Sequence, residues 1–248
     1  MKRQAFLIES SQITGEPDLP GARVDTEKWK QFLLSDKGGA WEDYEIETVH
    51  HPSSNELRAR LLLVKADYVF ITFSGHGYHL QGEMLQDTHI CLRYKDNMPI
   101  RDVVPSSARC TFVIDSCREV VFEKMANAAD LLRALSAVNE RYEDRRAEYR
   151  ALFDSHVLQA GPGLIRLFAC NIGEVADEGP TSGGLYTRSL IQGATNWHRK
   201  TPHDEKSVYS VWNAHSDAAM LTTAEKSEQH PQYDEGRRYF RFPLAVKP

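Results

Sequence analysis

The stretch Thr111-Phe-Val-Ile-Asp-Ser-Cys-Arg118 passes from apolar and β-favouring residues straight into a polar end that carries one cysteine. A short apolar run of this kind is typical of a parallel strand that is buried on both faces. Open α/β sheets gather their reactive groups at the carboxyl ends of such strands. The stretch therefore predicts a core strand that delivers the Cys117 thiol to that edge of a sheet.

A second run, Tyr68-Val-Phe-Ile-Thr-Phe73, has the same character and ends in Ser74-Gly-His-Gly77. It predicts another core strand, which stops at an imidazole instead of a thiol. Because the carboxyl ends of parallel strands share one edge, we expect His76 and Cys117 to lie close together.

The segments before His76 alternate between strand-like and helix-like patterns. Residues 5–8 and 44–50 are expected as strands, with an irregular loop from Ser10 to Arg23 after the first. Asp25 is expected to cap a helix, and Ser53 or Ser54 to open a second one that runs to about Lys65. This order predicts an α/β fold with a mainly parallel central sheet, right-handed crossovers and helices on both faces.

Beyond His76 the expected elements are less regular. In chain order they are a strand over 88–92, a loop over 93–107, a helical stretch over 119–156, a strand over 164–170, a loop over 171–183, a helix over 184–196, an amphipathic segment over 207–221, and an edge strand over 239–242 that Pro243 closes. No linker rich in Gly, Ser or Pro divides the chain. We therefore expect one domain over residues 1–248, with halves over 1–118 and 161–248 and a charged insert over 119–160.

Composition restricts the partners and the compartment. The 248 residues are 41% hydrophobic, which supplies a sizeable core, and the net charge of −5 gives no electrostatic reason to expect nucleic acid or an anionic membrane. The four cysteines show neither CxxC spacing nor a disulfide-dense pattern. The amino-terminal apolar run is too short for a signal peptide, and no segment approaches the length of a membrane helix. A cytoplasmic protein with protein partners is expected.

The pair of Cys117 and His76 suits acyl transfer. A cysteine attacks a carbonyl only as thiolate, and its ordinary pKa of about 8.5 leaves little thiolate at neutral pH without a neighbour that accepts the proton. His76 could accept that proton and later protonate a leaving amine. Gly77, which has no side chain, could bring its N–H close to a developing oxyanion together with the N–H of Cys117.

Each of these residues alone has a simpler interpretation. A cysteine at a strand end is usually a small buried apolar group, and a histidine after a strand is usually an ordinary loop residue. Their joint occurrence at two strand ends favours a function. The other cysteines, Cys91, Cys110 and Cys170, belong to apolar strands and are expected to be structural. His76 and His79 lack the helical HExxH spacing and further ligands, so no metal is predicted.

The segments Phe73-Ser-Gly-His-Gly77 and Ile114-Asp-Ser-Cys117 resemble the histidine and cysteine motifs of caspase-like cysteine peptidases, and most of all those of metacaspases. The similarity extends over most of the chain, through Leu19-Pro-Gly-Ala-Arg-Val-Asp25, Gly183-Gly-Leu-Tyr-Thr187 and His230-Pro-Gln-Tyr233. The resemblance implies a caspase-hemoglobinase fold, with His76 and Cys117 as the catalytic dyad and Gly77 in the oxyanion hole.

The same resemblance implies a substrate preference. In metacaspases the residue two positions before the nucleophile is an aspartate that receives Arg or Lys of the substrate, and in this chain it is Asp115. A carboxylate at that place favours a cationic side chain by ion pairing. Ser74 matches another residue of the metacaspase pocket, and Glu9 is expected as a third wall.

Two features depart from the metacaspase pattern. Arg118-Glu-Val120 stands where metacaspases usually have His-Ser-Gly after the nucleophile, so the following loop must be built differently. The acidic cluster with which calcium-dependent metacaspases bind their ion is not found. No cofactor is therefore predicted, and a dependence on calcium is left open.

Together these features predict a cysteine endopeptidase that cuts proteins after Arg or Lys. The alternatives are a catalytically silent caspase-like module that binds partners, and a thioester or acyl-transfer hydrolase that uses the same dyad. The habits of the family also suggest a zymogen that it or an upstream protease activates by a cut within 139–150, and a role in cell death or antiviral defence. The basic residues of that stretch are Arg141, Arg145, Arg146 and Arg150. A stable helical hairpin is the simpler interpretation of the insert.

Overall fold

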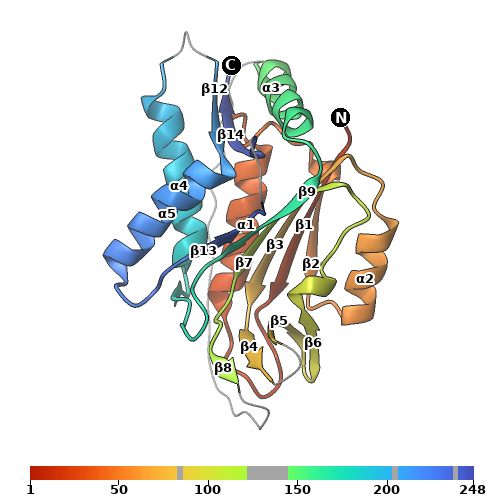
Figure 1. Ribbon diagram of the computed structural model, residues 1–248, viewed down its shortest axis with the longest axis vertical. Coiled ribbons are helices and arrows are strands. Elements are labelled where there is room, and N and C mark those ends of the chain that lie inside the picture. The colour runs from red at the N-terminus through yellow and green to blue at the C-terminus, as the bar shows by residue number, and fades with distance from the viewer. Residues whose placement is uncertain (83–85, 122–144, 203–205, 237–239) are drawn as a thin grey trace.

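The computed structural model describes residues 1–82, 86–121, 145–202, 206–236 and 240–248. Its centre is a six-stranded sheet in the order β13-β9-β7-β3-β1-β2 (Figure 1). These strands are β1 (Arg3–Ser10), β2 (Ile46–His50), β3 (Tyr68–Gly75), β7 (Arg109–Asp115), β9 (Gly163–Phe168) and β13 (Gln232–Asp234). All neighbours pair in parallel except β13, which runs antiparallel to β9. The predicted mainly parallel α/β sheet is confirmed.

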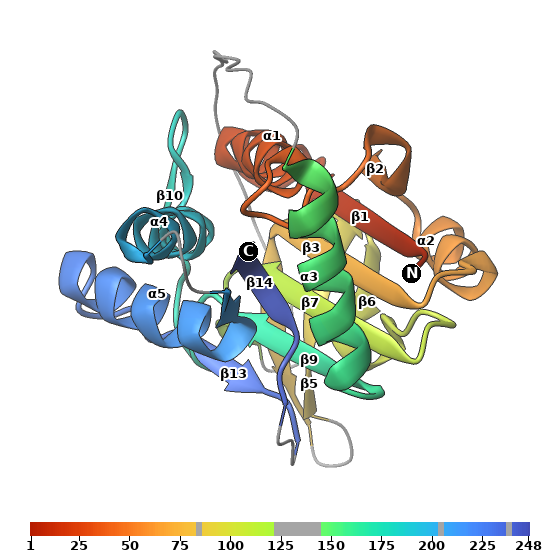
Figure 2. The same cartoon turned by 90° about the horizontal axis from the view of Figure 1, so that it is seen from above.

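Two hydrophobic cores cover the two faces of this sheet. Alternate residues of β1 divide between them, because successive side chains of a strand point to opposite faces: Leu7 belongs to one core and Ile8 to the other. The first core holds α1 (Pro20–Leu34), α3 (Arg146–Gln159), α4 (Leu185–Lys200) and α5 (Val211–Glu225), whereas the second holds α2 (Ser54–Leu63). Within the first layer, α4 and α5 lie side by side (Figure 2).

The starts of α1 and α2 show how local sequence sets the helix boundaries. Ser53 caps α2 with a complete capping box to Glu56, as expected for a serine at that place. Helix α1 begins at Pro20, whose missing N–H is no loss in the first turn of a helix. The prediction that Asp25 caps this helix is therefore wrong, because Asp25 lies inside α1 and is buried. The loop before the helix is correspondingly shorter than expected.

A second, four-stranded sheet in the order β6-β5-β4-β8 adjoins the carboxyl edge of the central one. It consists of β4 (Gly77–Gln81), β5 (Gln86–Arg93), β6 (Asp96–Pro99) and β8 (Val120–Val121), and a 3-10 turn (Ile100–Asp102) follows β6. The expected loop over 93–107 thus contains a strand, and the expected helix from 119 begins as a strand. Pairing of β8 with β4 overrides the helical pattern at Val120 and Val121.

The carboxyl-terminal half also departs from the expected boundaries. The loop over 171–183 holds the short hairpin of β10 (Glu178–Gly179) and β11 (Gly183–Gly184), and the amphipathic segment splits into β12 (Ser207–Ser210) and α5. The last strand, β14 (Pro243–Lys247), begins at Pro243 instead of ending there and pairs with β12. A proline is acceptable as the first residue of a strand. Part of the expected strand over 239–242, Tyr239, lies outside the described residues.

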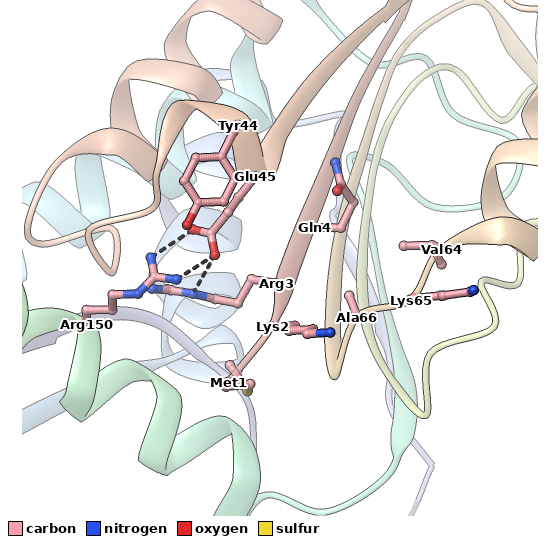
Figure 3. A pocket seen from close by; sticks show the side chains of 10 residues that line it. All are labelled: Met1, Lys2, Arg3, Gln4, Tyr44, Glu45, Val64, Lys65, Ala66 and Arg150. Atoms are coloured by element: carbon pink, nitrogen blue, oxygen red, sulfur yellow. Dashed lines mark hydrogen bonds and ion pairs between the residues drawn. The ribbon is translucent and has the colours of Figure 1, made fainter.

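Helix α3 is anchored to the amino edge of the sheet by charged groups (Figure 3). Arg150 donates to the Glu45 carboxylate at 2.5 and 2.8 Å, and Glu45 lies in the 3-10 turn Asp43–Glu45 before β2. Arg3 lies buried with its guanidinium carbon 4.8 Å from the Trp41 ring centre and 5.2 Å from that of Phe153. This edge lies opposite the carboxyl ends of the parallel strands, where reactive groups were expected.

Candidate active site

The carboxyl ends of β3 and β7 bring the predicted site residues together. Ser74 pairs in register with Asp115, so the segments that follow, with His76 and Cys117, leave the sheet side by side. A cavity of about 180 Å³ opens between them. It is lined by Pro17, Leu19, Ala22, Asp25, Ser74, Gly75, His76, Asp115, Ser116, Cys117, Val175, Ala176, Glu178 and Gly184. Of the residues predicted for the dyad, the oxyanion hole and the substrate pocket, Glu9 and Gly77 are not among those that line it.

A backbone carbonyl orients the His76 ring. Its Nε2 lies 2.6 Å from the oxygen of Pro17, in the loop before α1. A carbonyl oxygen can only accept a hydrogen bond, so Nε2 carries the proton in this contact and the neutral ring keeps Nδ1 as its acceptor. The ring is thereby held at the cavity with one nitrogen fixed and the other able to take a proton.

The Cys117 thiol lies in the same cavity and is partly shielded from solvent. Its Sγ donates to the carbonyl oxygen of Ala176 at 3.9 Å. Burial raises the pKa of Cys117 and outweighs this contact, and the nearby carboxylates of Glu119, Asp115 and Glu178 raise it further. Formation of the Cys117 thiolate therefore requires a base, and His76 lines the same cavity.

Gly77 lies against Ser116 and Cys117. A Cβ on Gly77 would lie 2.5 Å from Ser116 Oγ and 2.9 Å from the oxygen of Cys117, so only glycine fits there. The N–H of Cys91 donates to the oxygen of His76, so these two residues form a hydrogen-bonded pair of the β4–β5 ladder. Such pairs alternate with non-bonded pairs, so the N–H of Gly77, which is paired with Ile90, points away from β5. The Gly77 N–H thus points to the same side as that of His79, which bonds the oxygen of Glu119.

Three carboxylates line the cavity: the predicted Asp115, and also Asp25 and Glu178. Asp115 Oδ2 accepts from the N–H of Thr187 at 3.0 Å, and Asp25 Oδ1 accepts from the N–H of Gly184 at 2.9 Å. Burial, followed by the neighbouring Asp115, raises the pKa of Asp25 well above its ordinary value. Burial and Asp115 likewise raise the pKa of Glu178 to about 7. The hydrogen bond from the Gly21 N–H acts in the opposite direction, because it stabilises the ionised Glu178 carboxylate. Burial thus raises the pKa of all three carboxyl groups of this acidic cavity.

Sequence reasoning missed Asp25 and Glu178. Asp25 follows Ala22 and precedes Trp29 and Phe32 at helical spacing, so it is an acid on the apolar face of α1, and that pattern could have revealed it. Glu178 lies in a segment that reads as a polar loop, beside Asp177, and carries no such signal.

Glu9, expected as a wall of this pocket, does not line the cavity and instead binds residues of the loop after β1 and the end of β2. It is fully buried at the end of β1, accepts from the N–H of Ser11 at 2.8 Å and lies 2.7 Å from His50 Nδ1. Arg23 lies 3.7 Å from the same carboxylate. These contacts make Glu9 an anchor for the loop after β1.

The other three cysteines differ from Cys117 in that burial raises the pKa of their thiols strongly. Burial raises the pKa of Cys91 to about 12 and raises those of Cys110 and Cys170 further. Only Cys117 lines the cavity among the cysteines, all of which are described. Within the described part of the chain, no group of three His, Cys, Asp or Glu side chains has the arrangement of a metal site.

The basic residues of the insert have different surroundings. Arg141 lies outside the described residues. Arg145 precedes α3 and pairs with Glu148 on the surface, at 3.1 Å. Arg146 lies within α3 and donates to the carbonyl oxygens of Leu34 and Trp41, and Arg150 is bound to Glu45. None of the helices in the described residues is long and apolar enough to cross a bilayer.

Known proteins show the same fold. The chain is similar to the protein GSU0716 from Geobacter sulfurreducens, with a TM-score of 0.60, 12% identity and 100% of both chains covered. It is also similar to caspase-1 from Spodoptera frugiperda, with a TM-score of 0.56, 11% identity, and 96% of this chain and 89% of that one covered. No curated protein sequence matches. A family model described as a caspase domain matches residues 2–240. Because that match spans nearly the whole chain, the protein belongs to the caspase-like family of cysteine peptidases.

Proposed function

We propose that this protein is a cysteine endopeptidase that cleaves proteins after Arg or Lys. The observation that carries the proposal is the acidic cavity beside Cys117, lined by the three carboxylates of Asp25, Asp115 and Glu178. An ionised carboxylate binds a guanidinium or ammonium group by charge-assisted hydrogen bonds, and a guanidinium can bridge two carboxylates with its fork of donors. An acidic residue of a substrate would be repelled from the same cavity.

The dyad supplies the chemistry of cleavage. His76 accepts the proton of Cys117 at Nδ1, and the Cys117 Sγ bonds to the carbonyl carbon of the substrate. The carbonyl oxygen becomes an oxyanion that the N–H groups of Gly77 and Cys117 bind. The C–N bond then breaks as His76 returns its proton to the leaving amine, and water hydrolyses the thioester that remains.

Latency is part of the proposal, and Arg145 is the basic residue of the described insert that best suits an activating cut. It precedes α3 and is exposed, although its Nη2 donates to the carbonyl oxygen of Pro248 at 3.2 Å. Arg146 and Arg150 are less exposed, and each would have to leave several partners on the body of the protein before a protease could bind it. The enzyme itself or an upstream protease could make the cut. A role in cell death or antiviral defence follows from the family resemblance alone.

Internally quenched peptides that differ only in the residue before the scissile bond test the proposed specificity. Wild-type protein, whole and after mild proteolysis, should cleave the Arg and Lys peptides and leave the Asp and norleucine peptides intact. Cys117→Ala should cleave none. Hydrolysis of small thioesters without peptide cleavage would indicate an acyl-transfer hydrolase. Failure of a peptidyl electrophile to label Cys117 in any form of the protein would indicate a silent binding module.

A further inference from the structure

Arg118, the residue after the nucleophile, points away from the cavity and is buried, with 7% of its surface exposed. Its Nε donates to Thr88 Oγ1 on β5 at 3.0 Å, and its Nη1 donates to the carbonyl oxygen of Cys170, beyond the end of β9, at 3.2 Å. The guanidinium carbon lies 4.1 Å from the centre of the Phe168 ring. One side chain thereby connects the nucleophile turn to both sheets.

The backbone around Arg118 forms a second connection. Its N–H donates to the oxygen of Glu174, and its oxygen accepts from the N–H of Gly173, both at 2.9 Å. The Cys170 thiol donates to the oxygen of Ser116 at 3.4 Å. The turn 116–118 and the loop 170–176 are therefore one bonded unit, and this loop carries the Ala176 oxygen that accepts from the Cys117 thiol.

Burying this cation carries an electrostatic cost. Burial lowers the pKa of Arg118, although nearby Cys170, Asp87 and Glu174 act in the opposite direction. An apolar side chain could fill such a site without desolvating a charge, so the buried guanidinium is not expected to make the folded protein more stable than an apolar residue would. The guanidinium instead fixes geometry, because its planar donors bind Thr88 and Cys170 together only when these two residues are held in one arrangement.

We propose that Arg118 is a positioning residue whose guanidinium holds the nucleophile turn against loop 170–176 and so fixes the Cys117 thiol relative to the acidic cavity. The inference rests on the proposed function for the role of that cavity. It concerns the segment in which this chain departs from metacaspases, where Arg118-Glu-Val120 stands in place of His-Ser-Gly. The bonded unit is the way in which this chain builds the loop differently.

Two variants and a matched control test the proposal. Arg118→Met removes both donors with little loss of volume, and Arg118→Lys keeps the charge but replaces the planar fork of donors by a single ammonium nitrogen. Arg3→Met is the control, because Arg3 is also buried beside aromatic rings but lies at the opposite edge of the sheet (Figure 3). Thermal unfolding is measured for all variants. The maleimide labelling rate of each cysteine is followed by mass spectrometry, and kcat and KM are measured with an Arg peptide.

Arg118→Met should raise the labelling rate of Cys170 by about tenfold or more and lower kcat by about 100-fold, because a shift of about 1 Å can cost that much. KM should change less than about threefold, since the N–H groups that hold Asp25 and Asp115 belong to Gly184 and Thr187, outside the loop, and the loop lines the cavity only with the apolar residues Val175 and Ala176. Arg118→Lys should lie between this variant and wild type. Arg3→Met should leave Cys170 protected and kcat within about threefold of wild type.

The proposal is overturned if Cys170 stays protected in Arg118→Met, or if kcat falls no further than in Arg3→Met. Labelling does not depend on peptidase activity. If the wild-type protein cleaves no Arg peptide, the proposed function fails while the labelling rates still decide whether Arg118 holds the loop.

Discussion

Gly184 lies so close to Asp115 that a Cβ on Gly184 would overlap the Asp115 carboxylate. Gly184 is also the residue whose N–H holds Asp25. One backbone position thus sets the spacing of two carboxylates in the acidic cavity, and its lack of a side chain is what allows them to approach.

Gly184→Ala should therefore disturb the cavity without touching the dyad. We expect kcat/KM for an Arg peptide to fall by about tenfold or more, mainly through KM, because a methyl group must displace Asp115 or the start of α4. Alkylation of Cys117 by iodoacetamide should stay near the wild-type rate. Gly161→Ala, at a glycine between α3 and β9 with open space around its Cα but a φ of +72°, separates loss of pocket space from general backbone strain.

Removal of either dyad member should abolish turnover. Cys117→Ala deletes the nucleophile, and His76→Ala should cost about 10²–10⁴ in kcat, the usual contribution of a general acid and base. Both variants should unfold at nearly the wild-type temperature, since neither residue belongs to the two hydrophobic cores. Cys91→Ser provides a control at a thiol outside the cavity. Peptide cleavage by Cys117→Ala at anything near the wild-type rate would contradict the mechanism.

The fold and the positions of the dyad were predictable because they depend on short, strongly apolar runs. The runs that end at Ser74 and Asp115 have the length and composition of buried strands, and parallel pairing of those strands places His76 and Cys117 at one edge. The pocket was less predictable, because Asp25 and Glu178 come from a helix and a hairpin that lie far from Asp115 in sequence. Glu9, expected as a third wall, is not among the residues that line the cavity and instead contacts Ser11 and His50, because an acid at a strand end can pair with local partners as easily as point into a cavity.

Some boundaries failed where pairing partners decide the local structure. Val120 and Val121 follow a helical pattern but form β8, since β4 offers them a ladder that no local signal reveals. Pro243 reads as the end of a strand but begins β14, because a proline disturbs a ladder less at the first position than within it.

Asp115→Asn should lower kcat/KM for Arg peptides by about 100-fold or more. Loss of one partner from a buried charge pair costs about 2–5 kcal/mol, and asparagine keeps the shape and can still accept from Thr187. No comparable activity on Asp peptides should appear, because Asp25 and Glu178 remain. Glu9→Gln is the control, a buried carboxylate outside the cavity, and should leave the preference for Arg unchanged. A wild-type profile that peaks at Asp would reject an Arg and Lys pocket altogether.

Phe153→Ala should destabilise the protein by about 3–5 kcal/mol through a cavity in the first core. Phe153 is 2% exposed and packs against Trp41 and Tyr68, so it joins α3 to the sheet. Chemical denaturation measures the loss. If a cut at Arg145 activates the enzyme, α3 should stay docked by these contacts, and intact-mass spectra of the activated protein should show both fragments held together. Full activity of an uncut chain would eliminate the activation step.

The pH dependence of substrate binding should report Glu178. Burial, and then Asp115 and Asp177, raise the pKa of Glu178 to about 7, while the hydrogen bond from the Gly21 N–H lowers it. Asp177 is itself paired with Lys226, at 2.9 Å. A cation binds the ionised carboxylate better than the neutral acid, so KM for an Arg peptide should fall as pH rises through about 7. Binding near that pH should release protons.

The same shift affects stability with the opposite sign. A carboxyl group whose pKa is raised by folding favours the folded state when neutral, so the empty protein should lose stability as pH rises from the ordinary value of 4.5 towards 7. Glu178→Gln should remove the pH dependence of KM and reduce that of stability. Part of the pH dependence of stability should remain, because burial and Asp115 also raise the pKa of Asp25. Titration of the dyad is followed separately through the pH dependence of Cys117 alkylation by iodoacetamide, which carries no charge and so does not depend on binding to the carboxylates. If KM for the Arg peptide keeps its pH dependence in Glu178→Gln, the titrating group is Asp25 or Asp115 and Glu178 does not contact the substrate cation.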